Sequence, residues 1–456
     1  MSFLGRISSA LRQLVSPPLR SSLPLPVRTL RLPSPPIVPS APARGPSVAS
    51  AEAQAKPRRE RVYDAFDSSM PVATRTGLAG RDRELERLSE AVLLRRSHAI
   101  VFGPRGSGKT SLARIFGEVA DNLHALVLYN LASGDAQFDD LFRPLLIELA
   151  GQLPAPVGAM AERIAAGPFN ARALANLLVE AQPRQPVVLV LDEFDRVESQ
   201  HTKAEVAALM KLLSDMRSNV RLLLVGIAGN VEDLLDGHPS LRRHLVSVPI
   251  GGIDIGSMQQ LLEQLVARAG MTVTAEAIEL ITSAAAGSPY HVRLFGLHAA
   301  LAALAVGSAE ITRPSVRAGL QEALMAWREV GGELDTAVVE ELSRRTRLGH
   351  ATAAVCWMAI TRLRVDRREL ADSLAETFGD IGPEQARDMA DRAIALLRDD
   401  LPIKTDDESQ LVFSDTLKPQ FLLQIYCGTI DVASSIKPTA PVNPLRAQLL
   451  TGEHAA

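Results

Sequence analysis

The chain has 456 residues, 46% of them hydrophobic, and a formal net charge of −3. This length suits two or three domains, and the near-neutral balance gives the whole chain no electrostatic preference for nucleic acid or membrane surfaces. No apolar run approaches the roughly 20 residues that an integral membrane segment needs. The two cysteines, Cys356 and Cys427, lack a CxxC spacing, which favours a reducing compartment. We expect a cytoplasmic location of the bacterial type.

The first 60 residues differ in composition from the rest of the chain. They contain eleven prolines, and nine Arg or Lys against two acids, so they cannot bury enough apolar surface to fold alone. We therefore expect a disordered Pro/Arg-rich tail over residues 1–72. One face of a short helix within it would carry Phe3, Leu4, Ile7, Leu11, Leu14 and Val15. Three interpretations stay open, namely an incidental pattern in a flexible tail, a helix that docks on a partner or membrane, and a mitochondrial presequence over residues 1–30.

Helical and strand patterns alternate over residues 73–252, which predicts a parallel sheet with helices on both faces. The expected strands cover residues 97–102, 125–129, 186–191, 221–227 and 246–250. The run at 186–191 is apolar throughout, as is typical of a central strand that is buried on both faces. This section would be the nucleotide-binding core.

Directly after the first expected strand, residues 103–110 read GPRGSGKT, which fits the phosphate-binding pattern GxxxxGKS/T at every required position. Such a loop aims successive backbone N–H groups at phosphates, at the positive end of the following helix. Lys109 would reach the β- and γ-phosphates, and the Thr110 hydroxyl would hold Mg²⁺. The residues expected to bind ATP here are Gly103, Pro104, Arg105, Gly106, Ser107, Gly108, Lys109, Thr110 and Ser111.

Two adjacent acids, Asp192 and Glu193, follow the apolar strand. Asp192 could orient Mg²⁺ across from Thr110, and Glu193 could align and polarise the attacking water. Acids often simply terminate strands, but ligands of such sheets collect at the carboxyl ends of the strands. Downstream of a complete phosphate-binding loop, we therefore expect these two residues to be functional.

The remaining sections are helical for most of their length. Residues 253–332 show only helical patterns and would form a lid. Residues 333–430 read as helices followed by two short strands at 401–405 and 411–414, which is the layout of a winged-helix-like domain. Residues 431–456 would be a C-terminal tail.

The ligand of the winged-helix-like domain cannot be chosen from its charges alone. Its last helix, at residues 383–399, carries more acids than arginines when the lead-in from Asp380 is included. Because phosphate contacts need clustered Lys and Arg, this helix would repel DNA. Arginines gather instead at residues 344–347 and 362–368. Duplex DNA and a protein partner both stay open.

Three segments together resemble the AAA+ ATPases, and they are residues 77–85 (GLAGRDREL), 189–196 (LVLDEFDR) and 224–230 (LVGIAGN). Within that family the chain is most similar to the origin-recognition/Cdc6-like and transposition-regulator branch, and the signalling STAND ATPases are near relatives. The resemblance covers residues 73–330. It implies a P-loop AAA+ parallel sheet of the α/β class with a helical lid, and Mg²⁺-dependent hydrolysis of ATP to ADP and phosphate.

The resemblance also implies roles for single residues. Arg81 would line the adenine pocket. Asn230 would be the polar sensor of the γ-phosphate, a position for which Gly229 competes. Arg243 or, as second choice, Arg242 would be an arginine finger that reaches the ATP of a neighbouring subunit.

Two further residues lie at the start of an expected lid helix. Arg293 would be the second sensor, but the usual Gly-x-x-Arg spacing of the family is not met. The Gly-x-Pro at residues 287–289 is instead similar to the STAND type, in which the proline, here Pro289, packs on the adenine.

The sequence thus predicts an AAA+ ATPase that uses ATP for conformational switching or for assembly into a homo-oligomer, in association with DNA during replication, transposition or defence. The alternative is a STAND-like signalling switch whose C-terminal domain senses a protein. A third and weaker possibility is an organellar ATPase, if the first residues are a presequence.

Overall fold

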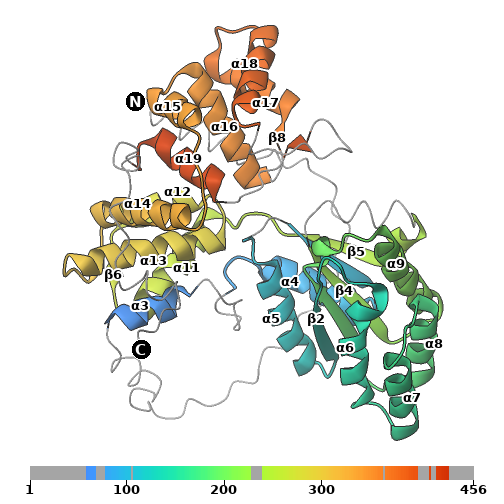
Figure 1. Cartoon of the computed structure of the whole chain (residues 1–456). Coiled ribbons are helices and arrows are strands. Elements are labelled where there is room, and N and C mark those ends of the chain that lie inside the picture. The colour runs from blue at the N-terminus through green and yellow to red at the C-terminus, as the bar shows by residue number, and fades with distance from the viewer. Residues whose placement is uncertain are drawn as a thin grey trace, which may run out of the picture.

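The structure is a computed structural model that describes residues 58–67, 78–103, 106–226, 239–362, 365–398, 410–411 and 417–430 (Figure 1). Three expected site residues, Pro104, Arg105 and Asn230, lie outside the described residues, as do the apolar stripe at residues 3–15 and the segment 431–456. Within the described ranges, no helix combines the length and apolar character that crossing a bilayer requires.

A five-stranded parallel sheet forms the centre of the nucleotide-binding core, as predicted, in the order β2-β3-β4-β1-β5. The strands are β1 (His98–Phe102), β2 (Leu126–Leu131), β3 (Val187–Asp192), β4 (Val220–Gly226) and β5 (Leu245–Pro249). Every residue of β3 and β4 is buried, because both strands lie inside the sheet and are covered on both faces. All carboxyl ends therefore meet at one edge of the sheet.

Helices cover both faces of this sheet and close two separate hydrophobic cores. Alternate residues of β4 show the division, since Leu222 and Leu224 enter one core while Leu223 and Val225 enter the other. One face is covered by α4 (Asp82–Ser89), its π-helical extension η2 (Glu90–Leu94) and α5 (Lys109–Asn122). The other is covered by α6 (Phe138–Ala150), α7 (Ala155–Ala165), α8 (Ala171–Ala181) and α9 (Gln200–Asp215).

The lid is helical, as expected, with one addition. Its helices are α11 (Ile255–Arg268), α12 (Ala275–Ala285), α13 (Pro289–Ala305) and α14 (Arg313–Glu329). Two short parallel strands, β6 (Thr272–Val273) and β7 (Glu310–Ile311), pair between them. Strands of two residues have no periodicity, so the sequence pattern did not reveal them.

The C-terminal section has the order of a winged-helix-like domain. It contains α15 (Thr336–Arg344), α16 (Arg347–Arg362), β8 (Val365–Asp366), α17 (Arg367–Phe378), α18 (Pro383–Leu396), β9 (Gln410–Leu411) and α19 (Lys418–Cys427). The partner of β9 is β8, which pairs with it antiparallel and was not expected, because its second residue is also the N-cap of α17. The expected strand at 401–405 lies outside the described residues.

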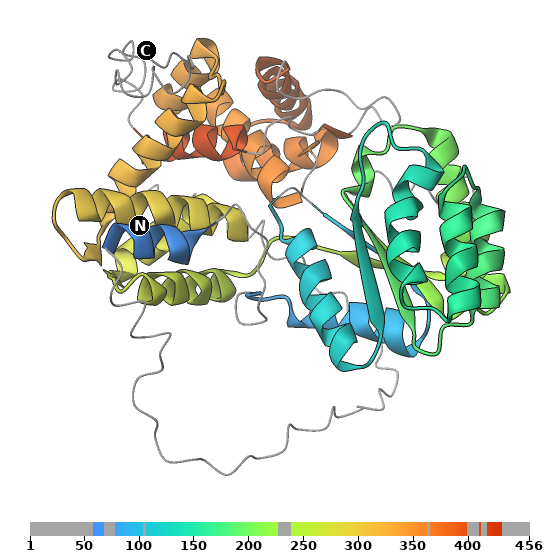
Figure 2. The same cartoon turned by 60° about the horizontal axis from the view of Figure 1, so that its bottom comes forward.

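A helix also forms where the sequence suggested part of a tail. Residues Arg58–Phe66 are helix α3, which lies against α11 and α13 (Figure 2). Val62, Ala65 and Phe66 are buried in the same hydrophobic core as the lid and the C-terminal helices. Because only these three residues carry the apolar stripe, between arginines and acids, the composition of the segment concealed it.

Candidate functional site

The phosphate-binding loop lies at the carboxyl edge of the sheet, between β1 and α5. Gly103 has no room for a side chain, since a Cβ there would lie 2.1 Å from the carbonyl oxygen of Ile250. Gly106 and Gly108 have φ angles of 75° and 90°, which glycine adopts at little cost. Gly108 is the N-cap of α5, so the first turn of a 14-residue helix points its N–H groups at the loop.

Asp192 ends β3 at the same edge, and it is held by two donors. Its side chain is 2% exposed. Oδ1 accepts a hydrogen bond of 2.8 Å from the backbone N–H of Glu193, and Oδ2 accepts one from the hydroxyl of Tyr129 in β2. Burial and this hydrogen bond raise the pKa of Tyr129 above its ordinary value, so the phenol remains a donor at neutral pH. Sequence reasoning missed Tyr129, which lies 63 residues from Asp192 in the chain.

The oxygens of Thr110 and Asp192 fit a magnesium ion. Both are hard ligands of the kind that Mg²⁺ prefers, and a carboxylate has lone pairs left after it accepts two hydrogen bonds. Within the described part of the chain, no three His, Cys, Asp or Glu residues gather into a metal site.

Glu193 adopts an unusual backbone conformation next to Asp192. Its φ of 53° lies in the left-handed region, which costs a residue other than glycine about 1–3 kcal/mol and often marks a functional site. The conformation starts a short helical turn, η3 (Phe194–Arg196). Arg196 folds back so that its Nε lies 2.8 Å from Oε2 of Glu193. The carboxylate of Glu193 therefore shares its charge with Arg196, and its role in aligning a water molecule stays a prediction.

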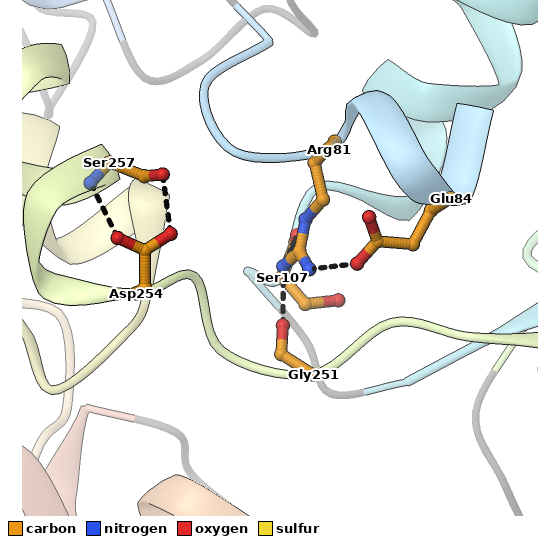
Figure 3. Close-up of polar contacts among 6 residues, drawn as sticks. All are labelled: Arg81, Glu84, Ser107, Gly251, Asp254 and Ser257. Atoms are coloured by element: carbon orange, nitrogen blue, oxygen red, sulfur yellow. Dashed lines mark hydrogen bonds and ion pairs between the residues drawn. The ribbon is translucent and has the colours of Figure 1, made fainter. Parts of the chain in front are cut away.

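Arg81 contacts three parts of the chain, at Glu84, Ser107 and Gly251 (Figure 3). Its Nη1 donates to Oε1 of Glu84 at 2.9 Å, and Nη2 donates to the carbonyl oxygens of Ser107, at 3.1 Å, and of Gly251. The side chain is only 3% exposed. Burial lowers the pKa of Arg81, and Glu84 opposes that shift. The adenine contact expected of Arg81 stays a prediction.

The start of α13 in the lid lies against the loop. The hydroxyl of Ser288 donates to the carbonyl oxygen of Gly106 at 3.4 Å, and a Cβ on Gly106 would lie 3.2 Å from Cβ of Tyr290. Pro289 is the first residue of α13, so it lies between two residues that meet the loop. Its packing on an adenine stays a prediction.

Arg293 is one helical turn further along α13 and is 9% exposed. Burial and the nearby charge of Arg268 lower the pKa of Arg293, while Asp67 raises it. This arginine therefore lies among lid side chains, and its sensor role stays a prediction.

The two candidate finger arginines lie on the surface, away from the buried site residues. Arg242 and Arg243 end the short helix η4 (Pro239–Arg243), and both side chains are exposed. Leu241 beside them is fully buried and fixes the turn to the core. The finger role of Arg243 or Arg242 stays a prediction.

Comparison with known proteins agrees with the sequence motifs. Residues 77–225 match the family model described as an AAA ATPase domain. No curated protein matches the chain.

Among solved structures, the chain is similar to Cdc6p from Pyrobaculum aerophilum, at 16% identity and a TM-score of 0.43, over 82% of this chain and 99% of that one. It is also similar to the Aeropyrum pernix Orc1 protein in complex with DNA, at 17% identity and a TM-score of 0.42, over 80% and 96%. A third similarity is to the RuvB Holliday junction branch migration motor of Thermotoga maritima, at 15% identity and a TM-score of 0.39, over 76% and 97%. These similarities are distant.

Proposed function

We propose that this ATPase couples ATP binding and hydrolysis to movement of its lid and to assembly of several copies, in association with DNA. The match of residues 77–225 to an AAA ATPase domain supports ATP hydrolysis. The contact that carries this proposal is the one between Ser288 and Gly106. It joins the phosphate-binding loop to α13, and α13 shares one hydrophobic core with the C-terminal helices. A change at the phosphates would therefore reach the C-terminal section.

The proposed site combines three groups of residues with separate roles. The loop and Lys109 would hold the triphosphate. Thr110 and Asp192 would hold Mg²⁺, which would neutralise charge that develops on the phosphates. Tyr129 fixes the carboxylate of Asp192. Glu193 would align the attacking water, either with its ion pair to Arg196 kept or after that ion pair has broken.

We propose that ATP-bound copies form a homo-oligomer in which Arg243 or Arg242 of one subunit acts at the site of the next. Their exposure supports this role, since a buried arginine could not cross to a neighbour. A positive charge near the γ-phosphate stabilises the transition state and is worth orders of magnitude in rate.

Duplex DNA is the proposed partner of the winged-helix-like domain, and its exposed arginines would supply the phosphate contacts. Several of these arginines already lie within 4 Å of acids, in the pairs Arg347–Asp380, Arg367–Asp391, Arg392–Asp388 and Arg344–Glu340. DNA must compete with these pairs. Since exposed ion pairs are worth about 0–1 kcal/mol each, a polyanion could displace them.

The same pairs favour a second candidate function, a STAND-like signalling switch. In that case the neutralised surface of the winged-helix-like domain contacts a protein, and ATP loading releases an inhibited state. For either function, we propose that the protein is located in the cytoplasm, or in mitochondria if residues 1–30 are a presequence.

Mass photometry of Glu193→Gln, with and without ATP and duplex DNA, separates the two functions. ATP-dependent oligomers that load onto DNA, and dissociate from it as salt rises, support the assembly ATPase. A protein that stays monomeric with ATP and with DNA contradicts the assembly ATPase and supports the signalling switch. Lys109→Ala is the matched control, because it should remain a monomer under all conditions.

A further inference from the structure

The connector between the sheet and the lid, residues 250–254, makes close backbone contacts through its two buried residues, Ile250 and Ile253. On the loop side, the N–H of Ile250 donates to the carbonyl oxygen of Phe102 at 2.7 Å, and the carbonyl oxygen of Ile250 fills the space beside Gly103. On the lid side, the N–H of Ile253 donates to the carbonyl oxygen of Gly287 at 2.9 Å. The connector is thus attached to the phosphate-binding loop and to the lid at once.

The segment that precedes α4 also contacts the connector and the start of the lid, at Ile253 and Ser257. A Cβ on Gly80 would lie 2.6 Å from Oγ of Ser257, in the first turn of α11. Asp254 caps that turn through hydrogen bonds of 3.0 Å and 2.6 Å from the N–H and hydroxyl of Ser257 (Figure 3). Gly80 therefore fixes where the lid begins, and the next residue, Arg81, turns inward.

The side chain of Arg81 donates hydrogen bonds both to the phosphate-binding loop and to the connector. One of its nitrogens, Nη2, donates to carbonyl oxygens that lie 26 and 170 residues away, in the loop and in the connector. Among the residues that the structure describes, its counter-ion is Glu84, whose Oε1 lies 2.9 Å from Nη1 of Arg81 and whose side chain is 24% exposed. A guanidinium suits this task because its planar fork presents several donors in fixed directions. A buried charge is tolerated only while such partners remain in place.

The hydrogen bond to Ser107 has a consequence for phosphate binding. In a trans peptide, the carbonyl group of one residue and the N–H of the next point in opposite directions. Arg81 holds the carbonyl of Ser107, so it also fixes the direction of the N–H of Gly108, away from Arg81. The N–H groups of this loop are the ones expected to bind phosphates.

We infer that Arg81 is a positioning residue that couples nucleotide binding in the phosphate-binding loop to the placement of the lid connector. It orients the peptide between Ser107 and Gly108 on one side and holds the carbonyl of Gly251 on the other. Binding of a triphosphate tightens the loop around Ser107, and the shared guanidinium passes that constraint to Gly251. This inference rests on the proposed function, because it requires that the loop binds ATP.

Arg81→Met tests the inference, since it keeps a long side chain and removes every donor. We expect ATP to bind about 10- to 100-fold more weakly, which is the range for loss of a hydrogen bond to a charged group. The KM for ATP should rise by a larger factor than the factor by which kcat falls. Arg81→Lys keeps the charge and one donor direction, and should recover part of the affinity. Arg83→Met removes an exposed arginine two residues away and should behave as wild type.

Hydrogen exchange of residues 250–256 gives a readout that a purely stabilising residue would not affect. In the wild type, saturating ATP should slow exchange in this segment. In Arg81→Met, saturating ATP should slow exchange in α5 but leave the connector unchanged. Should Arg81→Met fail to fold, Arg81→Lys and Glu84→Gln should each show a reduced connector response.

The outcomes separate this inference from the proposed function. A wild type that binds ATP without any change in the connector overturns the inference and leaves the ATPase intact. An Arg81→Met protein whose connector responds to ATP as in wild type also overturns it. Failure of the wild type to bind ATP in titration with a fluorescent analogue overturns the proposed function as well.

Discussion

Mild acid should destabilise the nucleotide-binding core through a single buried histidine, His98, at the start of β1. The side chain is fully buried. Its Nδ1 accepts a hydrogen bond of 2.9 Å from the N–H of Leu222, and its Nε2 lies 2.8 Å from the carbonyl oxygen of Met210. Only the neutral ring with its proton on Nε2 satisfies both contacts, because the doubly protonated ring has no acceptor. Burial, with smaller contributions from Arg221 and His244, lowers the pKa of His98 to about 3.

The size of this destabilisation follows from the difference between the pKa values of His98 in the folded and unfolded chain. The unfolded chain binds a proton at His98 below its ordinary pKa of 6.5, while the folded chain does so only near 3. The stabilisation is therefore fully present above pH 6.5 and is lost as the pH falls, by about 1.4 kcal/mol per pH unit. Going from pH 6.5 to 5 should cost about 2 kcal/mol, and the whole interval about 5 kcal/mol.

Urea unfolding at a series of pH values, followed by circular dichroism, measures this loss in the wild type and in His98→Asn. The variant should be less stable at pH 7.5 because it loses hydrogen bonds, but its free energy of unfolding should fall by about 2 kcal/mol less between pH 6.5 and 5. Burial also lowers the pKa values of His298 and His350; they titrate in both proteins and cancel in the difference. Parallel curves for the two proteins would refute the role of His98.

Three substitutions test the site itself. Lys109→Ala should abolish ATP binding in calorimetry. An unchanged affinity for ATP would contradict the prediction that residues 103–110 bind the phosphates. Glu193→Gln should bind ATP but turn over at least ~100-fold more slowly, since an amide cannot polarise water as a carboxylate does; turnover within a few-fold of wild type would assign the role to another acid. Tyr129→Phe removes a hydrogen bond from Asp192 and should raise the Mg²⁺ concentration for half-maximal activity about 10-fold. An unchanged Mg²⁺ dependence would show that Tyr129 does not position this carboxylate.

The sheet could be predicted from the sequence because its central strands are buried on both faces. Such strands are continuous apolar runs, and a glycine-rich loop followed by a helix fixes the strand that precedes it. The match of residues 77–225 to an AAA ATPase domain agrees with the family expected from the motifs of the core. The roles implied for Arg81, Arg293 and Pro289 are not tested by the fold and stay predictions.

Other features could not be predicted because they depend on contacts between distant residues. Tyr129 meets Asp192 only through the register of β2 on β3, in which Tyr129 pairs with Val190. Arg81 is buried although arginine is usually exposed, and its partners lie in segments that no local pattern connects. Helix α3 is short and highly charged, and its apolar stripe becomes meaningful only once the lid is present.

The position of α3 also sets an order of events during synthesis. Phe66 leaves the ribosome early, yet a neighbour in its core, Gly296, where a Cβ would lie 2.5 Å from the ring, follows about 230 residues later. At roughly 5–20 residues per second, this delay lasts on the order of 10–50 s. The whole parallel sheet emerges within that interval and can fold as an insertion between the two halves of the lid core. Until translation passes α13, the apolar face of α3 remains available to chaperones.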